Sequence, residues 1–372
     1  MKIKIFIAAG IVSFVMIHPP ILCAQGSLTP PGGPAPTMKS LDQIEPRTLV
    51  SFVPYNIVHP GSFYLTTNLT GVGGTNGITI AANNVTLDLN GFALNGVSGS
   101  IDGIYVSGSH TNIVVRNGTL SGWGTNGVDG GLANNLSCER LTVSSCSYGI
   151  VAYNATVSGC AVQSCGSDGI YIVSSTVSGC TIQSCGNDGI SADLAKVSDC
   201  KVQSCFTGIN ASYSTVSGCT VLSSGGDGLS VSYSTVSGCM AQSSGSDGIY
   251  ANSSTVSGCY VKGSAFSGIL VDAPGCQIIG NNCTGNNTTA NANNAGIYLD
   301  DANNRVEDNQ VTASGYAGIS VYGTYSGNII IKNTVAGSGA NNYLTPGSQV
   351  VGPLITSYGT ITSVNPWANF SF

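Results

Sequence analysis

The motif Thr156-Val-Ser-Gly-Cys160, followed by a polar segment and then by Asp168-Gly169-Ile170, repeats along the chain from residue 155 to residue 270. Its most regular mark is a glycine followed by an isoleucine or leucine. These marks begin at Gly149, Gly169, Gly189, Gly208, Gly228, Gly248 and Gly268. All but one of these glycines follow the previous one at the same spacing, and Gly208 comes a single position early. A fixed period of roughly 20 to 50 residues is typical of a solenoid, whose units bury their apolar side only against neighbouring units.

The same mark continues on both sides of this stretch with longer steps. It stands at Gly77, Gly103, Gly296 and Gly318, and in a weaker form, with a valine after the glycine, at Gly127. Between the marks lie short runs of β-branched and apolar residues, bounded by Gly and Asn, which is the pattern of short strands. The density of Gly, Ser, Asn and Val opposes helices, and leucine is too scarce for a leucine-rich repeat. Twelve marks therefore predict an all-β fold, a right-handed parallel β-helix solenoid of about twelve coils.

A second solenoid has a coil of the same length. The middle of the chain can also be divided into blocks of five residues, such as Ala155-Thr-Val-Ser-Gly159, and in this it resembles pentapeptide-repeat proteins. The central position of the third block is polar, however, being Ser167 in one coil and Asn187 in the next. The coils on either side of this stretch are longer and do not keep a five-residue period. The β-helix with three strands in each coil is therefore favoured.

Composition shifts divide the chain into five segments. Residues 1–24 read as a secretory signal, because Lys2 and Lys4 precede an apolar run and a small-residue end at Ala24. Residues 25–37 form a Pro/Gly-rich linker, 38–59 an N-terminal cap, 60–340 the β-helix, and 341–372 a C-terminal cap or wrap rich in aromatic residues. A sorting tail ending at Phe372 is the alternative for the last segment. The signal predicts a secreted or cell-surface protein.

Charge is sparse and mostly negative. Charged residues make up 8% of the chain, against about 25% in typical domains. The net charge is −6, and it becomes −8 without Lys2 and Lys4, with 9 basic against 17 acidic residues. A chain with no basic stripe is a poor partner for nucleic acid or an anionic membrane. No later stretch is long and apolar enough to span a bilayer, and a monomer is expected.

Most of the fourteen cysteines follow the repeat. One position is occupied by Cys160, Cys180, Cys200, Cys219, Cys239 and Cys259, and a second by Cys165, Cys185 and Cys205. The favoured interpretation is stacked, buried thiols that act as small apolar groups. Stacked coils lie about 4.8 Å apart, within disulfide reach, so bridges between coils remain open. A metal site is least favoured, because no CxxC pair occurs.

Alternation along a strand places the residue after Gly-Ile on the outer surface. This column contains Tyr105, Tyr171, Tyr250 and Tyr298, with Ser and Asn in other coils. Exposed rings beside hydroxyls and amides suit a long glycan, bound by stacking and hydrogen bonds. Scattered surface tyrosines without a binding role would look the same, and both interpretations stay open.

Two groups of acidic residues are candidates for chemistry. An aspartate precedes the mark in several coils, at Asp102, Asp168, Asp188, Asp227 and Asp247. The last four are candidates for Ca²⁺, which takes six to eight oxygen ligands, and exposed turn residues are the alternative.

The densest charged group is Asp300 and Asp301 with Arg305, Glu307 and Asp308. Asp300, Asp301 and Arg305 are its candidate catalytic residues, since glycoside hydrolysis uses paired carboxyl groups. The alternative is that Asp300 and Asp301 only stabilise a turn.

Several segments resemble secreted bacterial right-handed β-helix proteins of the pectin-lyase-like superfamily. They are Pro60-Gly-Ser-Phe-Tyr-Leu-Thr, Asn84-Val-Thr-Leu-Asp-Leu-Asn-Gly-Phe and Gly296-Ile-Tyr-Leu-Asp-Asp-Ala-Asn-Asn-Arg-Val-Glu-Asp-Asn, with the closing Asn365-Pro-Trp-Ala-Asn-Phe typical of one uncharacterised group. The resemblance implies the fold over residues 38–372. It does not imply one activity, because the superfamily includes lyases, hydrolases, epimerases, adhesins and proteins without known activity.

The motifs of the superfamily's enzymes are missing. The chain lacks the Asn-Thr-Asp and Gly-His-Gly motifs of polygalacturonases and the Asp-Pro-His-Glu motif of alginate epimerases, and His59 and His110 are isolated. The favoured prediction is a secreted or cell-surface protein without catalytic activity, structural or weakly glycan-binding, needing no cofactor unless Ca²⁺ binds. The alternative is a polysaccharide lyase or glycoside hydrolase, and the third is an adhesin that binds another protein.

Overall fold

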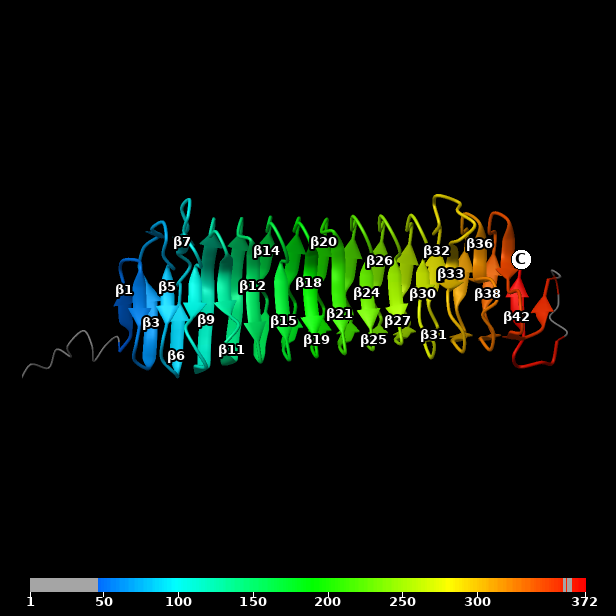
Figure 1. The fold of residues 1–372 in the computed structure, drawn as a ribbon, viewed down its shortest axis with the longest axis horizontal. Coiled ribbons are helices and arrows are strands. Elements are labelled where there is room, and N and C mark those ends of the chain that lie inside the picture. The colour runs from blue at the N-terminus through cyan, green and yellow to red at the C-terminus, as the bar shows by residue number, and fades with distance from the viewer. Residues whose placement is uncertain (1–45, 357–358, 360–362) are drawn as a thin grey trace, which may run out of the picture. The chain divides into compact units, whose positions relative to one another are not determined.

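The computed structural model describes residues 46–356, 359 and 363–372. The predicted signal segment 1–24, the linker 25–37 and residues 38–45 of the predicted cap lie outside the described residues. Arg47 to Phe372 form one compact unit, in which the chain winds as a long solenoid (Figure 1). All regular structure in the described residues is β-strand.

Each turn of the solenoid contributes one strand to a 14-stranded sheet, named sheet B, and most turns contribute two strands to a 28-stranded sheet, named sheet A. The strands of sheet B are β2 (Tyr55–Ile57), β5 (Ile78–Ile80), β8 (Ile104–Val106), β10 (Asn126–Gly130), β12 (Tyr148–Tyr153), β15 (Ile170–Val173), β18 (Asp188–Asp193), β21 (Thr207–Ser212), β24 (Leu229–Ser232), β27 (Ile249–Asn252), β30 (Ile269–Val271), β33 (Ala295–Leu299), β36 (Ala317–Val321) and β39 (Asn341–Leu344). These strands pair in parallel, so each turn stacks directly on the last.

Sheet A has two columns of strands, which make two further faces of the solenoid. The first column holds β1 (Thr48–Val50), β3 (Gly61–Leu65), β6 (Val85–Asp88), β13 (Ala155–Ser158), β16 (Thr176–Ser178), β19 (Lys196–Ser198), β22 (Thr215–Ser217), β25 (Thr235–Ser237), β28 (Thr255–Ser257), β31 (Gln277–Ile279), β34 (Arg305–Glu307), β37 (Ile329–Ile331) and β40 (Val350–Val351). The second column holds β4 (Leu69–Thr70), β7 (Ala93–Asn95), β14 (Ala161–Gln163), β17 (Thr181–Gln183), β20 (Lys201–Gln203), β23 (Thr220–Leu222), β26 (Met240–Gln242), β29 (Tyr260–Lys262), β32 (Asn282–Thr284), β35 (Gln310–Thr312), β38 (Thr334–Ala336) and β42 (Asn369–Ser371).

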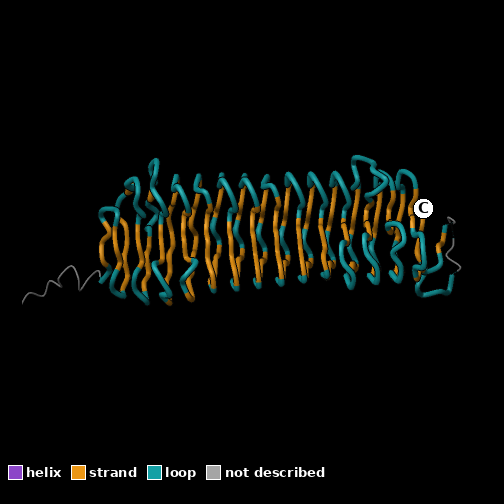
Figure 2. Tube along the Cα trace, viewed as in Figure 1, coloured by secondary structure: helices purple, strands orange, loops and turns teal. Residues whose placement is uncertain are grey.

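Two long strands join the columns into one sheet. β9 (Thr111–Ser121) and β11 (Asn134–Ser144) run through both columns, and the short β41 (Leu354–Ile355) pairs with β42. Figure 2 shows the strands of successive turns lying nearly parallel in one straight stack.

The predicted all-β parallel solenoid is therefore confirmed. Sheet B has fourteen strands, one in each turn, close to the twelve coils predicted. Twelve of these strands carry the glycine mark, and the two additional ones are β2 and β39. β1 and β2 lie within the segment 38–59, for which a cap was predicted, and β39 lies within 341–372.

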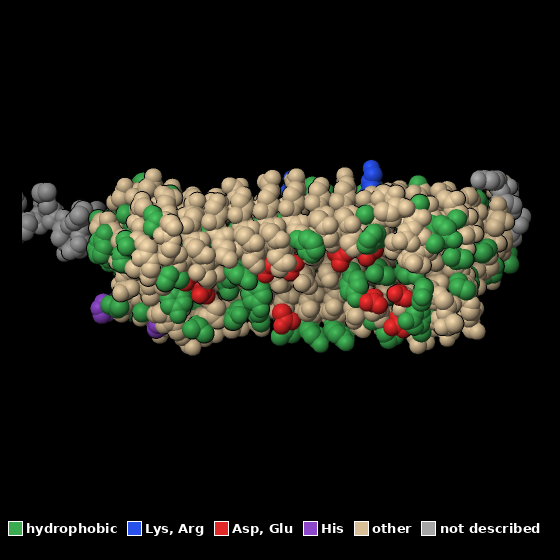
Figure 3. Space-filling model, turned by 45° about the horizontal axis from the view of Figure 1, so that its top comes forward, with side chains coloured by type: hydrophobic (Ala, Val, Ile, Leu, Met, Phe, Trp, Pro, Cys, Tyr) green, Lys and Arg blue, Asp and Glu red, His purple; other side chains and the backbone are tan. Residues whose placement is uncertain are grey.

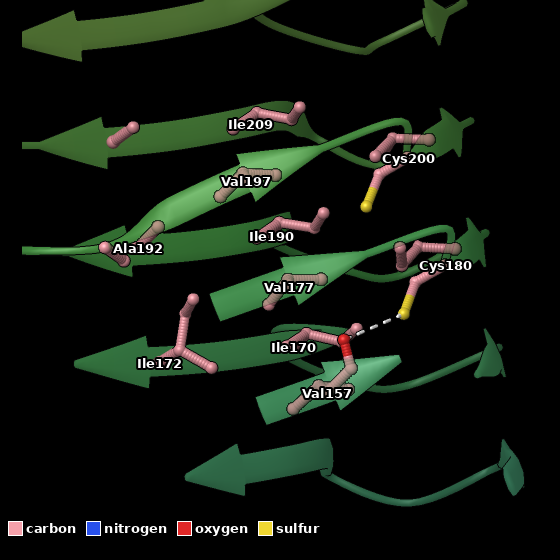
Figure 4. Close-up of a cluster of buried hydrophobic side chains, with 14 of the residues drawn as sticks. Val157, Ile170, Ile172, Val177, Cys180, Ile190, Ala192, Val197, Cys200 and Ile209 are labelled. Atoms are coloured by element: carbon pink, nitrogen blue, oxygen red, sulfur yellow. Dashed lines mark hydrogen bonds between the residues drawn. The ribbon is translucent and has the colours of Figure 1, made fainter. Parts of the chain in front are cut away.

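The core is a continuous column of inward side chains. Ile170 and Ile172 of β15 point inward together with Val177 of β16, and all three are fully buried (Figure 4). The same positions in the next turn are occupied by Ile190, Ala192 and Val197. Identical β-branched residues stack well on a pleated surface, which explains why the repeat specifies this core.

The glycine of most marks allows sheet B to approach the second column of sheet A. A Cβ atom on Gly189 would lie 2.2 Å from a Cγ atom of Val202, and one on Gly248 would lie 2.1 Å from the matching atom of Val261. Both distances are far below van der Waals contact, so no other residue fits without a shift of the backbone. The mark is thus a packing requirement of a narrow solenoid.

We expect Gly189→Ala to lower the free energy of unfolding by about 1–3 kcal/mol, the usual cost of forcing an extra methyl group into a packed core. The measurement is urea unfolding followed by far-UV circular dichroism. Gly225→Ala is the control, since its nearest heavy atom would be 3.6 Å away, and it should change stability little. Equal losses in the two variants would contradict the packing argument.

The cysteines line the core as free thiols. All thirteen in the described residues are buried and unpaired, as expected for small apolar groups, and the absence of disulfide bridges between coils stays a prediction. Cys180 illustrates the arrangement, since its thiol lies 3.8 Å from the carbonyl oxygen of Val157 in the preceding turn (Figure 4). Burial raises the pKa of Cys138 and Cys283 to about 12.

Buried thiols are inaccessible to reagents in solution and are therefore inert. The native protein is therefore expected to react negligibly with Ellman's reagent, and the denatured protein, without the signal segment, to release thirteen equivalents of chromophore. A lower count after denaturation without reductant would reveal disulfide bonds between coils and contradict this description.

Candidate functional site

The outer face of sheet B carries the predicted tyrosine column. Tyr105, Tyr171 and Tyr250 are half-buried at the centre of β8, β15 and β27, between neighbours that point into the core. Tyr298 of β33 also lies outside the core but is only 5% exposed. It packs with Tyr322, at a ring distance of 6.5 Å, and with Leu270 and Leu344. The prediction of an exposed ring therefore fails for Tyr298, because the longer coils near the C-terminal end cover it.

The tyrosines of this column do not form one continuous platform. Three turns separate Tyr105 from Tyr171, which corresponds to roughly 14 Å at the usual strand spacing. Each ring instead joins residues of other columns in a local group, and two groups stand out.

The first group forms a groove of about 430 Å³ over β10, β12 and β15. Its walls are three tyrosines, and its polar atoms come from carboxyl, amide and hydroxyl groups. The lining residues are Thr125, Asn126, Asp129, Tyr148, Val151, Tyr153, Asp168 and Tyr171. The rings of Tyr153 and Tyr171 are 6.2 Å apart and tilted by 55°. Burial, followed by the neighbouring Tyr153, raises the pKa of Tyr171, so its hydroxyl stays protonated and can donate a hydrogen bond.

The second group lies toward the C-terminal end of the same face. Strand pairing aligns Val271 with Leu299, and so places Asp272 beside Asp300 in the next turn. The hydroxyl of Tyr250 donates a hydrogen bond to Asp272. Burial raises the pKa of Asp300, and the negative charges of Asp272 and Asp301 add to that rise. Figure 3 shows acidic side chains ringed by apolar and aromatic ones in this part of the molecule.

The predicted catalytic set is divided by the fold. Asp300 and Asp301 follow β33 of sheet B, whereas Arg305 begins β34 of sheet A. The Nε atom of Arg305 donates to Glu307 at 2.6 Å, and Lys332 reaches the same carboxylate at 2.7 Å. These cations, Lys332 first, lower the pKa of Glu307. Arg305 is thus the partner of Glu307, and the residue beside Asp300 is Asp272.

Asp272 was missed from the sequence, although a signal for it exists. The step that separates Gly268 from Gly296 also separates residue 272 from residue 300. Aligning coils by their marks would have paired the two aspartates.

The aspartates that precede the mark are buried, with the exception of the half-buried Asp227. The alternative of exposed turn residues is therefore wrong. An Oδ1 atom of Asp168 accepts from the backbone N–H of Asp188 at 3.1 Å, and Asp247 accepts from Ser267 at 2.6 Å. The carboxylates satisfy donors of the next turn, which would otherwise be buried without a partner. No group of three or more metal-ligating side chains occurs in the described residues, and Ca²⁺ at Asp168, Asp188, Asp227 and Asp247 stays a prediction.

Charge is separated between the faces. Ten acidic residues lie in the strands of sheet B or within two residues of them, and no lysine or arginine of the described chain does. The ten are Asp102, Asp129, Asp168, Asp188, Asp193, Asp227, Asp247, Asp272, Asp300 and Asp301. Figure 3 shows acidic side chains on the face in view, with the basic side chains that can be seen at its upper edge. The outer face of sheet B therefore has a negative potential.

Comparison with known families identifies the fold class. A family model described as "Right handed beta helix region" matches residues 72–215 and 191–335. The chain belongs to this family. No curated protein matches this right-handed beta helix by sequence.

Solved structures resemble this right-handed beta helix over most of its length. The A-module of mannuronan C-5 epimerase AlgE6 of Azotobacter vinelandii has a TM-score of 0.53 at 19% identity, covering 84% of this chain and 90% of that chain. The A-module of AlgE4 of the same organism has a TM-score of 0.51 at 18% identity, covering 79% and 91%. Gene product 12 of bacteriophage phi29, in its pre-mature form, has a TM-score of 0.55 at 13% identity, covering 80% of this chain and 52% of that chain. At these identities the likeness concerns the fold.

The right-handed beta helix shows no membrane-crossing helix in the residues that the structure describes.

The buried Asp247 makes stability depend on pH. Burial raises its pKa to about 7 in the folded protein, from 3.8 as the ordinary value. Between these values the folded state keeps a proton that the unfolded chain releases, so the free energy of unfolding falls as the pH rises through this window.

We expect Asp247→Asn to be more stable than the wild type at pH 8, with a smaller difference at pH 5. The amide oxygen of asparagine still accepts from Ser267 but carries no charge to bury. Urea unfolding of both proteins at the two pH values measures the difference. A difference that is the same at pH 5 and pH 8 would show that the charge of Asp247 is not responsible.

Proposed function

We propose that this right-handed beta helix is an exported protein of the cell surface or extracellular space, monomeric and without catalytic activity, which binds an uncharged polysaccharide along the outer face of sheet B. The observation that carries the proposal is the groove walled by Tyr148, Tyr153 and Tyr171, with Asp129 and Asp168 among its polar groups. Binding sites for small molecules combine apolar and aromatic walls with a few placed polar groups. A sugar ring offers both an apolar face to a tyrosine and hydroxyls to a carboxylate or an amide.

The charge of the face argues for an uncharged glycan. Polyuronates carry one carboxylate in each sugar residue. Ten acidic residues, four of them buried, lie in or beside the strands of sheet B, and in the described chain no basic residue does. A face of one sign repels ligands of the same sign. The same argument disfavours a uronate lyase on this face, since elimination needs a base beside an activated proton and positive groups on the substrate carboxylate.

A second candidate function is hydrolysis of a glycosidic bond by Asp272 and Asp300. Inverting and retaining glycosidases use two carboxyl groups, one of which must be protonated to act as the general acid. Strand pairing brings the two aspartates together, and the raised pKa of Asp300 suits the acid. Under this alternative, a neutral polysaccharide incubated with the protein yields shorter products, and Asp272→Asn and Asp300→Asn each abolish them.

The binding proposal predicts a measurable affinity for neutral polysaccharides and a much lower one for polyuronates. A glycan array followed by titration calorimetry on the purified protein tests this. Tyr171→Ala should weaken binding by about 0.5–1.5 kcal/mol, the usual contribution of one aromatic contact, with the fold intact by circular dichroism.

Tyr213→Ala is the matched control. Tyr213 is 59% exposed and stacks on Tyr233 at 4.9 Å, at the corner that follows β21 and away from the groove. Its loss should leave affinity unchanged. An equal loss of affinity in both variants, or no binding of any neutral polysaccharide by the wild type, would contradict the proposal.

A further inference from the structure

The first column of sheet A presents a face of different chemistry. Over six successive turns, β13 to β28, the residue before the buried central valine is a threonine in all but one turn, and the residue after it is always a serine. The first row is Thr156, Thr176, Lys196, Thr215, Thr235 and Thr255, and the second is Ser158, Ser178, Ser198, Ser217, Ser237 and Ser257. Eleven of the twelve outward positions thus carry a hydroxyl group.

These hydroxyls form a lattice with two fixed repeats. Each threonine pairs directly with the residue of the same row in the next turn, as Thr215 does with Thr235 and Thr235 with Thr255. Neighbouring strands lie about 4.7–4.9 Å apart, and alternate residues of one strand about 6.6–6.8 Å apart. Because the turns stack straight (Figure 2), the repeats persist over the whole patch. Threonine side chains are stiff at χ1, which limits the positions of their hydroxyls.

The lattice is also free of competing contacts. Among the described residues, the side chains of both rows make one hydrogen bond with the protein, from Ser257 to the carbonyl oxygen of Val236 at 3.4 Å. Other hydroxyls of this solenoid are consumed internally, as Ser234 is by the carbonyl of Ser232 at 2.7 Å. The rows are therefore available to an outside partner, and Lys196 is their one charged member.

The geometry points to a second activity of this protein, in which the threonine and serine rows bind the surface of an ice crystal. An uncharged, rigid array suits an uncharged partner that is itself periodic. Water molecules held by successive threonine hydroxyls would be spaced by the strand repeat, which is close to a lattice repeat of hexagonal ice. The threonine methyl groups between them favour ordered water over bulk water. Since the solenoid is already ordered, binding costs little conformational entropy.

Lys196 supplies the sharpest test, because it interrupts the lattice. Lys196→Thr completes the first row and should widen the gap between melting and freezing points measured with a nanolitre osmometer. The matched control is Lys201→Thr, which removes the same charge from the neighbouring strand β20, in the second column of sheet A. The control should leave the gap unchanged.

A disruptive pair completes the experiment. Thr235→Lys should abolish the gap and the inhibition of ice recrystallisation, whereas Thr181→Lys, on the exposed surface of β17, should preserve both. Circular dichroism and thermal unfolding confirm that the variants are folded.

Three results would overturn the inference. They are no thermal hysteresis or recrystallisation inhibition by the wild type, equal loss in Thr235→Lys and Thr181→Lys, or retention on a crystalline polysaccharide without any effect on ice. The outcome is separable from the glycan proposal, because Tyr171→Ala lies on sheet B and should leave ice binding intact.

Discussion

The close approach between the glycine marks of sheet B and the valines of the second column of sheet A is the constraint on which the solenoid depends. A Cβ atom at Gly169 would stand 2.5 Å from Ile182, and one at Gly208 would stand 2.2 Å from Val221. Because glycine is required at one position in the turns that carry the mark, any shift of a strand by one residue would bring a side chain into this gap. Strand alternation then turns that shift into an exchange of the inner and outer sets. The mark therefore fixes the register, and the register fixes which residues face outward.

The corners of the solenoid satisfy the backbone in a way that tolerates changes of residue type. The N–H of Cys259 donates to Asn281 of the next turn at 2.9 Å, and Asn281 in turn donates to Asn309 at 2.9 Å. At the neighbouring corner, Ser234 donates to Ser254 at 3.0 Å and Ser254 to the sulfur of Cys276 at 3.3 Å. Thiol, hydroxyl and amide groups thus replace one another at equivalent positions. The requirement at a corner is a small acceptor that can be buried, since an unpaired backbone N–H would cost free energy.

The predictions from sequence that succeeded are those that depend on the register alone. The mark alone predicted the fold and the outward column of Tyr105, Tyr171 and Tyr250, because both follow from the register. It could not show that Asp168 is buried, since an aspartate before glycine is equally typical of an open turn. Tyr298 failed for a similar reason, because its cover comes from Tyr322, a residue of the following turn whose loop the repeat does not describe.

Closeness in the sequence was also a poor guide to closeness in space where a corner of the solenoid lies between two residues. Arg305 follows Asp300 closely in the sequence, yet the corner between them moves it to another face, while Asp272 is a full coil away along the chain and lies alongside. In a solenoid, neighbours on one face are one coil apart, so a binding or catalytic group must be sought at the coil period. The three outer faces consequently carry independent sets of residues on one shared core. The tyrosine and aspartate face of sheet B, the threonine and serine face of the first column of sheet A and the face of its second column can each change without altering the register. This independence allows one repeat protein to hold two separate binding surfaces.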